Sequence, residues 1–163
     1  MTTNRQRIMS IMAAGAMLAI GTSAAVAATH PAIGTWQLNL AKSTDESTSA
    51  PPKSETFVFA ESAKGISLAT TIVGADGKST ATKGEPFKWD GMAHPESTNP
   101  DHDNVTVKQV GARTIEWAFT LKGALVRSGT LTVSRDGQMM TVSGASVGAK
   151  AGKVYFNDIF DRK

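Results

Sequence analysis

Arg127 is the side chain whose type and position most directly indicate chemistry in this sequence. It stands in an alternating stretch, residues 124–134, with the two-residue period of a β-strand. One face of that strand would carry Leu125, Arg127, Gly129, Leu131 and Val133. If this face is interior, the guanidinium requires a carboxylate partner or an anionic ligand group. The opposite register would place Arg127 in water, and the sequence leaves both registers open. In that opposite register, the inward residues of the strand would be Val126, Ser128, Thr130 and Thr132.

Large apolar side chains recur at every second position in two other stretches. Residues 114–121 carry Ile115, Trp117, Phe119 and Leu121 on one face, and residues 56–59 carry Phe57 and Phe59. We expect Trp117, Phe119, Phe57 and Phe59 to bind a ligand together with Arg127. The same interior would include Ile66, Leu68, Leu125 and Leu131. Such an interior is either an apolar cavity or a filled core, because small barrels often pack their interiors with side chains.

Catalytic and metal-binding motifs are missing from the sequence. It has no nucleophile elbow, phosphate-binding loop or zinc-protease motif. The absence of cysteine excludes thiol catalysis, cysteine metal sites and disulfides. Asp101-His102-Asp103 offers ligands for a metal, but Asn99-Pro100-Asp101 is equally a turn, so we expect no metal and no cofactor. In the alternative, a hydrolase or isomerase, Arg127 would act with Glu116 or Glu85.

Short alternating runs, separated by turn signals, must position these side chains. We expect eight or nine strands, among them residues 34–40, 56–59, 66–73, 79–89, 105–110, 114–121, 124–134, 139–143 and 154–160. Residues 41–52 and 92–103 read as irregular, although Ser43 and Glu46 also fit the capping box of a short helix. Local hairpin connections predict an all-β, antiparallel up-and-down meander. Closure into a small β-barrel is favoured over a sandwich, because it removes exposed edges.

The N-terminus has the features of a secretory signal peptide. Arg5 and Arg7 precede an apolar run over residues 8–20, and Ala25-Val26-Ala27 is a small-x-small cleavage site. The run is shorter than the roughly 20 residues of a membrane span. We expect cleavage after Ala27, no stable membrane anchor afterwards, one domain over residues 28–163, and a periplasmic or secreted protein.

The charge of the remaining chain excludes some partners. Of the 17 Lys and Arg residues, Arg5 and Arg7 belong to the signal, so the rest nearly balance the 14 Asp and Glu. A balanced chain gives no electrostatic reason to bind nucleic acid or an anionic membrane. We expect a monomer.

The segment Gly34-Thr35-Trp36-Gln37-Leu38-Asn39-Leu40-Ala41-Lys42-Ser43 resembles the start of the bacterial exported lipocalin-like proteins. Its Gly-x-Trp also resembles the first-strand motif of lipocalins. The resemblance implies a lipocalin-like barrel whose Trp36 closes one end, with an arginine near the C-terminus packed over the indole. By position this arginine is Arg162. The resemblance further implies a small, partly apolar ligand in the barrel or at its mouth; a solid-core interaction module is the remaining alternative.

Overall fold

The computed structural model describes residues 29–47, 49–148 and 152–163. The described chain contains eleven β-strands and no helix. The strands are β1 (Gly34–Leu38), β2 (Thr44–Asp45), β3 (Ser54–Ser62), β4 (Gly65–Val73), β5 (Ser79–Lys83), β6 (Asp90–Pro95), β7 (Asn104–Gly111), β8 (Thr114–Leu121), β9 (Ala124–Val133), β10 (Met139–Gly148) and β11 (Gly152–Arg162). The prediction of an all-β antiparallel meander is confirmed, but the expected eight or nine strands are too few for the eleven described. The predicted signal peptide, residues 1–27, lies outside the described residues.

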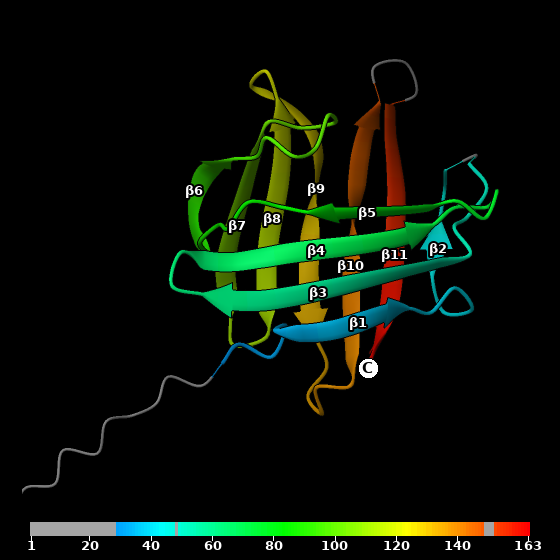
Figure 1. Cartoon of the computed structure of the whole chain (residues 1–163), viewed down its shortest axis with the longest axis horizontal. Helices are drawn as coiled ribbons and strands as arrows, with labels where there is room; N and C mark the ends of the chain where they lie inside the picture. Colours follow the sequence, from blue (N-terminus) through cyan, green and yellow to red (C-terminus); the bar gives the residue numbers. More distant parts are fainter. Residues whose placement is uncertain (1–28, 48, 149–151) are drawn as a thin grey trace, which may run out of the picture.

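The strands follow one another around a single curled sheet. Their order is β5-β4-β3-β1-β11-β10-β9-β8-β7-β6, so the first strand pairs with the last. In Figure 1, β1, β3, β4 and β5 form a front layer that crosses the upright strands β7 to β11 behind it. The crossing layers enclose one interior, to which each strand contributes alternate residues.

The described ladder is interrupted between β5 and β6, which form the two edges of the sheet. We predicted one strand over residues 79–89, but β5 ends at Lys83, and Gly84 and Pro86 follow it. The connection nevertheless stays close to β4. Ile66 and Phe87 exchange backbone hydrogen bonds of 2.8 and 2.9 Å. The barrel is therefore closed by pairing everywhere except at this gap.

Two segments that we predicted to be irregular contain strand. Within residues 41–52, β2 pairs with β11, with Asp45 opposite Phe156. The Ser43 hydroxyl accepts a hydrogen bond from the Ile159 amide at 2.9 Å, so the predicted helix cap instead joins this segment to β11. Within residues 92–103, β6 extends to Pro95 and pairs with β7 through a register shift. The pairing of β2 with β11 is long-range, whereas β6 is mostly exposed and its register shifts, so neither strand leaves a clear local pattern.

One end of the barrel is closed by Trp36. Its side chain is completely buried, and its indole Nε1 donates to the Ala32 carbonyl at 2.8 Å. Arg162, directly opposite on β11, places its guanidinium 4.1 Å from the centre of the indole ring. The guanidinium also donates to the carbonyls of Pro31, Ile33 and Gly137. Arg162 thus ties the N-terminal segment and the β9–β10 turn to the last strand.

Part of the buried apolar cluster surrounds the plug. It includes Leu38, Val133, Met140 and Phe160 beside Trp36. Phe57 stacks on Phe160 with ring centres 4.5 Å apart. This end is filled, so any hollow must lie further along the barrel.

Candidate ligand-binding cavity

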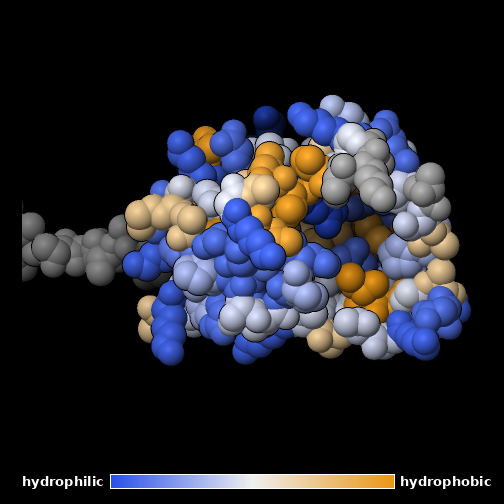
Figure 2. Space-filling model, turned by 90° about the horizontal axis from the view of Figure 1, so that it is seen from above, coloured by the Kyte–Doolittle hydropathy of each residue, from blue (hydrophilic) through white to orange (hydrophobic). Residues whose placement is uncertain are grey.

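A cavity of about 610 Å³ lies between the two layers. Seen from above, apolar groups surround a hollow in this face of the molecule, and hydrophilic groups lie within it (Figure 2). The exposed members of the lining are Ala50, Ala75, Thr82 and Thr98, where the cavity reaches solvent. The volume lies within the range of small-molecule sites, about 300–1,000 Å³. Of the two interiors that the sequence left open, the structure has the hollow one.

Aromatic side chains from β3 and β8 form much of the wall. Trp117 and Phe119 lie with ring centres 5.0 Å apart, and Phe57 meets Phe59 edge to face at 6.3 Å. All of them line the cavity. The alternation of each strand puts its aromatic residues on one side, and the crossing of the layers turns both sides inward.

A pair of glycines lies between the wall residue Trp117 and Phe156 of β11. Gly129 and Gly144 are directly opposite each other on β9 and β10, with Trp117 and Phe156 opposite them on the outer neighbours β8 and β11. A β-carbon on Gly144 would lie 3.0 Å from Cζ of Phe156. A β-carbon on either glycine would also collide with backbone atoms of the opposite strand, so the glycines allow β9 and β10 to approach closely beside the two rings, whose centres lie 6.2 Å apart.

Arg127 lines the cavity, and its strand presents the Leu131 face inward. Leu131 and Val133 are buried, which decides between the two registers. The guanidinium lies 4.2 Å from the centre of the Phe156 ring and 5.8 Å from that of Trp117. Its Nε is shielded from solvent and has no hydrogen-bond partner among the described residues. Arg127 is therefore a charged group held in the cavity mainly by aromatic faces.

Two carboxylates that we did not predict line the same cavity. Glu55 and Asp158 are half-buried, and each lies on the inward face of its strand. Burial raises the pKa of Glu55 to about 7; the charge of Asp158 adds to the rise and Arg127 opposes it. Burial also raises the pKa of Asp158, again against the effect of Arg127, while Asp45 adds to the rise. For both carboxylates, the attraction of Arg127 offsets only part of the cost of burying the charged form.

Their alternation with aromatic residues could have revealed them. Glu55 precedes Phe57 and Phe59 by two and four positions, and Asp158 stands between Phe156 and Phe160. The predicted strand, residues 56–59, begins two residues after the observed start of β3 at Ser54 and so leaves out Glu55.

A third carboxylate, Glu96, joins the two connections beside the gap. It is only 8% exposed. It accepts hydrogen bonds from the Glu85 amide at 3.0 Å and from the Thr98 amide and hydroxyl at 2.7 and 2.5 Å. Burial disfavours its charged form, but these hydrogen bonds outweigh burial and lower the pKa of Glu96. Glu96 therefore acts as a clamp at the rim of the cavity.

Beside Glu96, the His102 ring stacks on Phe119 with ring centres 4.3 Å apart, and burial lowers the pKa of His102.

Several predicted interior positions lie elsewhere. Glu116 and Glu85, the carboxylates of the enzyme alternative, are exposed and do not line the cavity. Leu125 is 45% exposed, because a register shift after Phe119 turns the start of β9 outward. Ile66 packs against the buried core, as predicted, but does not line the cavity, and Leu121 is half-buried and also outside the lining. Within the described residues, no cluster of three or more His, Asp or Glu side chains could hold a metal ion.

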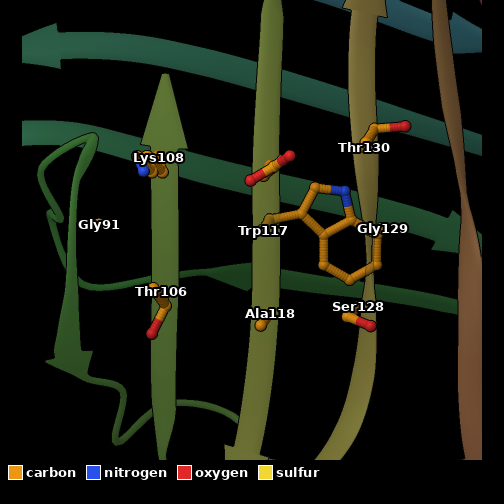
Figure 3. A pocket seen from close by; sticks show the side chains of 9 residues that line it. Gly91, Thr106, Lys108, Trp117, Ala118, Ser128, Gly129 and Thr130 are labelled. Carbon is orange, nitrogen blue, oxygen red and sulfur yellow. The ribbon is translucent and has the colours of Figure 1, made fainter. Parts of the chain in front are cut away.

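A second hollow, of about 430 Å³, lies on the outer face of β7, β8 and β9. Figure 3 shows Thr106, Lys108, Ser128 and Thr130 along these strands, and the ring of Trp117 beside Gly129. Trp117 is reached from both sides because Gly129 has no side chain to cover it. The lining alternates with the inward residues and belongs to the polar outer face of the sheet, so the interior cavity is the better candidate.

The part of the chain that the structure describes offers no helix long and apolar enough to cross a membrane.

No protein-family model matches the sequence, and no curated protein matches it either.

Solved structures, by contrast, include similar chains. The zebrafish ileal bile acid-binding protein, complexed with cholic acid, aligns at 10% identity with a TM-score of 0.50, over 82% of this chain and 99% of that one. The siderocalin Ex-FABP, described as functioning through dual ligand specificities, aligns at 10% identity with a TM-score of 0.39, over 82% of this chain and 74% of that one. At 10% identity, the alignment with the bile acid-binding protein shows a shared fold alone. The predicted lipocalin-like barrel is confirmed as a fold, whereas membership of the bacterial exported group stays a prediction.

Proposed function

We propose that this protein binds a small, partly apolar molecule inside the barrel. The observation that carries the proposal is the cavity of about 610 Å³, lined by aromatic and aliphatic groups with a few charged side chains among them. Ligand sites have this composition, because apolar contacts supply affinity and a few polar groups fix orientation. The bile acid-binding neighbour, crystallised with cholic acid, supports the same class of function.

The roles of the lining residues follow from their chemistry. Trp117, Phe119, Phe57 and Phe59 contact the apolar body of the ligand. Arg127 lies with Glu55 and Asp158 at the charged end of the cavity, and this end orients the polar group of the ligand. Trp36 and Arg162 close the opposite end and make no contact with the ligand.

The cellular setting belongs to the same proposal. We place the protein in the periplasm or outside the cell, as a monomeric member of the bacterial exported lipocalin-like proteins. The signal-like residues 1–27 and the Gly34-Thr35-Trp36 motif support this assignment. Detection of the N-terminus of the exported protein by mass spectrometry tests it, with Ala28 expected as the first residue.

Binding of a neutral hydrophobic dye tests the function. N-phenyl-1-naphthylamine should fluoresce on binding to the purified protein. Thr70 points into the cavity opposite Phe57, whereas its neighbour Thr71 is exposed. Thr70→Trp should fill part of the cavity and weaken dye binding by roughly tenfold, or about 1.4 kcal/mol. Thr71→Trp is the matched control and should bind as the unaltered protein does. Failure of the unaltered protein to bind, or an equal effect of both changes, would overturn the proposal.

A further inference from the structure

We infer that the cavity selects an apolar molecule whose polar end is a cationic amine, held by Glu55 and Asp158, over one whose polar end is a carboxylate paired with Arg127. The inference rests on the proposed function and names the class of ligand for the same site. Three features carry it: the ratio of charges in the cavity, the partners that Arg127 already has, and the partners that the carboxylates lack.

Negative side chains outnumber positive ones around the cavity. Its ionisable lining consists of Glu55, Glu96, Asp158, His102 and Arg127. Glu96 accepts its hydrogen bonds at the rim, and burial keeps His102 toward its neutral form. In the interior, two carboxylates therefore face one guanidinium. A ligand carboxylate would add a third negative charge in a poorly solvated space, whereas an ammonium group would balance the set.

Arg127 is already partly stabilised without a ligand, although its Nε has no hydrogen-bond partner among the described residues. Its guanidinium lies over the Phe156 ring and near the Trp117 ring, and both Glu55 and Asp158 interact with its charge. A ligand carboxylate would have to compete with these two acids for the same cation. The gain from binding an anion here is therefore smaller than for an isolated buried arginine.

The carboxylates, in contrast, lack donors. The ion pairs among the described residues are Lys42–Asp161, Lys78–Asp76 and His94–Asp90, none of them in the cavity. No hydrogen bond opposes the effect of burial on Glu55 or Asp158; Arg127 alone does so, from beyond ion-pair distance. Half-buried carboxylates without protein donors lose part of their hydration, and an ammonium group brings three donors and a positive charge.

The two carboxylates also approach from different elements. Glu55 lies near the start of β3, in the front layer, and Asp158 lies in β11, behind it (Figure 1). A group bound by both would lie between the layers. The aromatic wall of β3 and β8 would then enclose the apolar part of the ligand.

Three probes with the same tail test the inference. Decylamine, decanol and decanoate each compete with N-phenyl-1-naphthylamine at pH 8, where the amine is charged and Glu55 is mostly ionised. Decylamine should bind at least roughly tenfold more tightly than decanol, as expected for a charge-assisted hydrogen bond in a partly buried site. Decanoate should bind no better than decanol.

Variants show which residues cause the preference. Glu55→Gln and Asp158→Asn should each lower the ratio of decylamine affinity to decanol affinity by several-fold. Glu116→Gln removes a carboxylate from the outer face and should leave that ratio unchanged. A ratio that is the same in all three variants would contradict the assignment to Glu55 and Asp158.

The probes also separate this inference from the proposed function. If the dye itself does not bind, the proposed function fails. If all displace it equally, or if decanoate binds most tightly and loses affinity in Arg127→Gln, the binding function stands and the inference is overturned.

Discussion

A β-carbon on Gly34 would lie 2.5 Å from Nη1 of Arg162. Gly34 also has a φ of +135°, which side-chain-bearing residues rarely adopt. The glycine at position 34 of the Gly-x-Trp segment therefore leaves the space through which the Arg162 side chain reaches over Trp36.

Gly34→Ala should consequently destabilise the protein. Strained backbone costs about 1–3 kcal/mol, and displacement of the guanidinium adds to that cost. Urea denaturation followed by tryptophan fluorescence measures the change. Gly123→Ala is a suitable control, because Gly123 also has positive φ but a β-carbon there meets nothing within 4 Å. Equal losses in the two variants would show that contact with Arg162 is unimportant.

Trp36→Ala should separate the plug from the binding site. Removal of a completely buried tryptophan costs about 3–5 kcal/mol of stability. Because Trp36 does not line the cavity, dye affinity per folded molecule should stay the same. Titration with the dye below the denaturation midpoint checks this. A loss of affinity in fully folded protein would assign Trp36 to the binding site.

Glu55 should make stability depend on pH in an unusual direction. Its pKa is about 7 in the folded state, against an ordinary value of 4.5, so between these pH values the folded protein binds more protons than the unfolded one. The free energy of unfolding therefore falls as pH rises through this window, by up to about 3 kcal/mol.

Glu55→Gln should flatten this fall, with greater stability than the unaltered protein at pH 8. Urea titrations from pH 4.5 to 8 measure it. Asp158 has a shift of the same sign, so part of the dependence should remain. The exposed Glu116→Gln serves as control, and an unchanged slope in Glu55→Gln would refute the assignment.

Glu96→Ala should loosen the gap between β5 and β6. The change removes the acceptor for the Glu85 and Thr98 amides and should cost about 2 kcal/mol. Hydrogen exchange resolved by residue should show faster exchange of these two amides. The amide of Phe87, which donates to the Ile66 carbonyl instead, is an internal comparison. Unchanged protection of Glu85 and Thr98 would mean that Glu96 does not hold the connections together.

Alternation determined much of the fold in advance. The period of two in residues 114–121 requires Ile115, Trp117 and Phe119 to share a face, whatever the rest of the chain does. Glycine-containing turns placed the hairpins, and Lys122 and Gly123 indeed take the positive φ values, 51° and 79°, of a tight hairpin turn. Such local rules predicted the meander and the aromatic wall.

Pairing between distant segments could not be predicted from local sequence patterns. The strand β2 is two residues long and exposed, and its pairing with β11 depends on chain far away in sequence. The end of β5 at Lys83 and the clamp by Glu96 likewise depend on contacts between segments that carry no shared pattern.

The sequence by itself determined which side chains of each strand lie together, because a strand turns successive residues to opposite sides. It did not determine which side is inward: Arg127 was compatible with water or with the interior. Only the curling of the sheet decided this, since burial of Leu131 and Val133 forces Arg127 inward on the same face. The same curling brings Glu55 of β3 and Asp158 of β11 to one cavity, because pairing of β1 with both strands folds the two layers over each other.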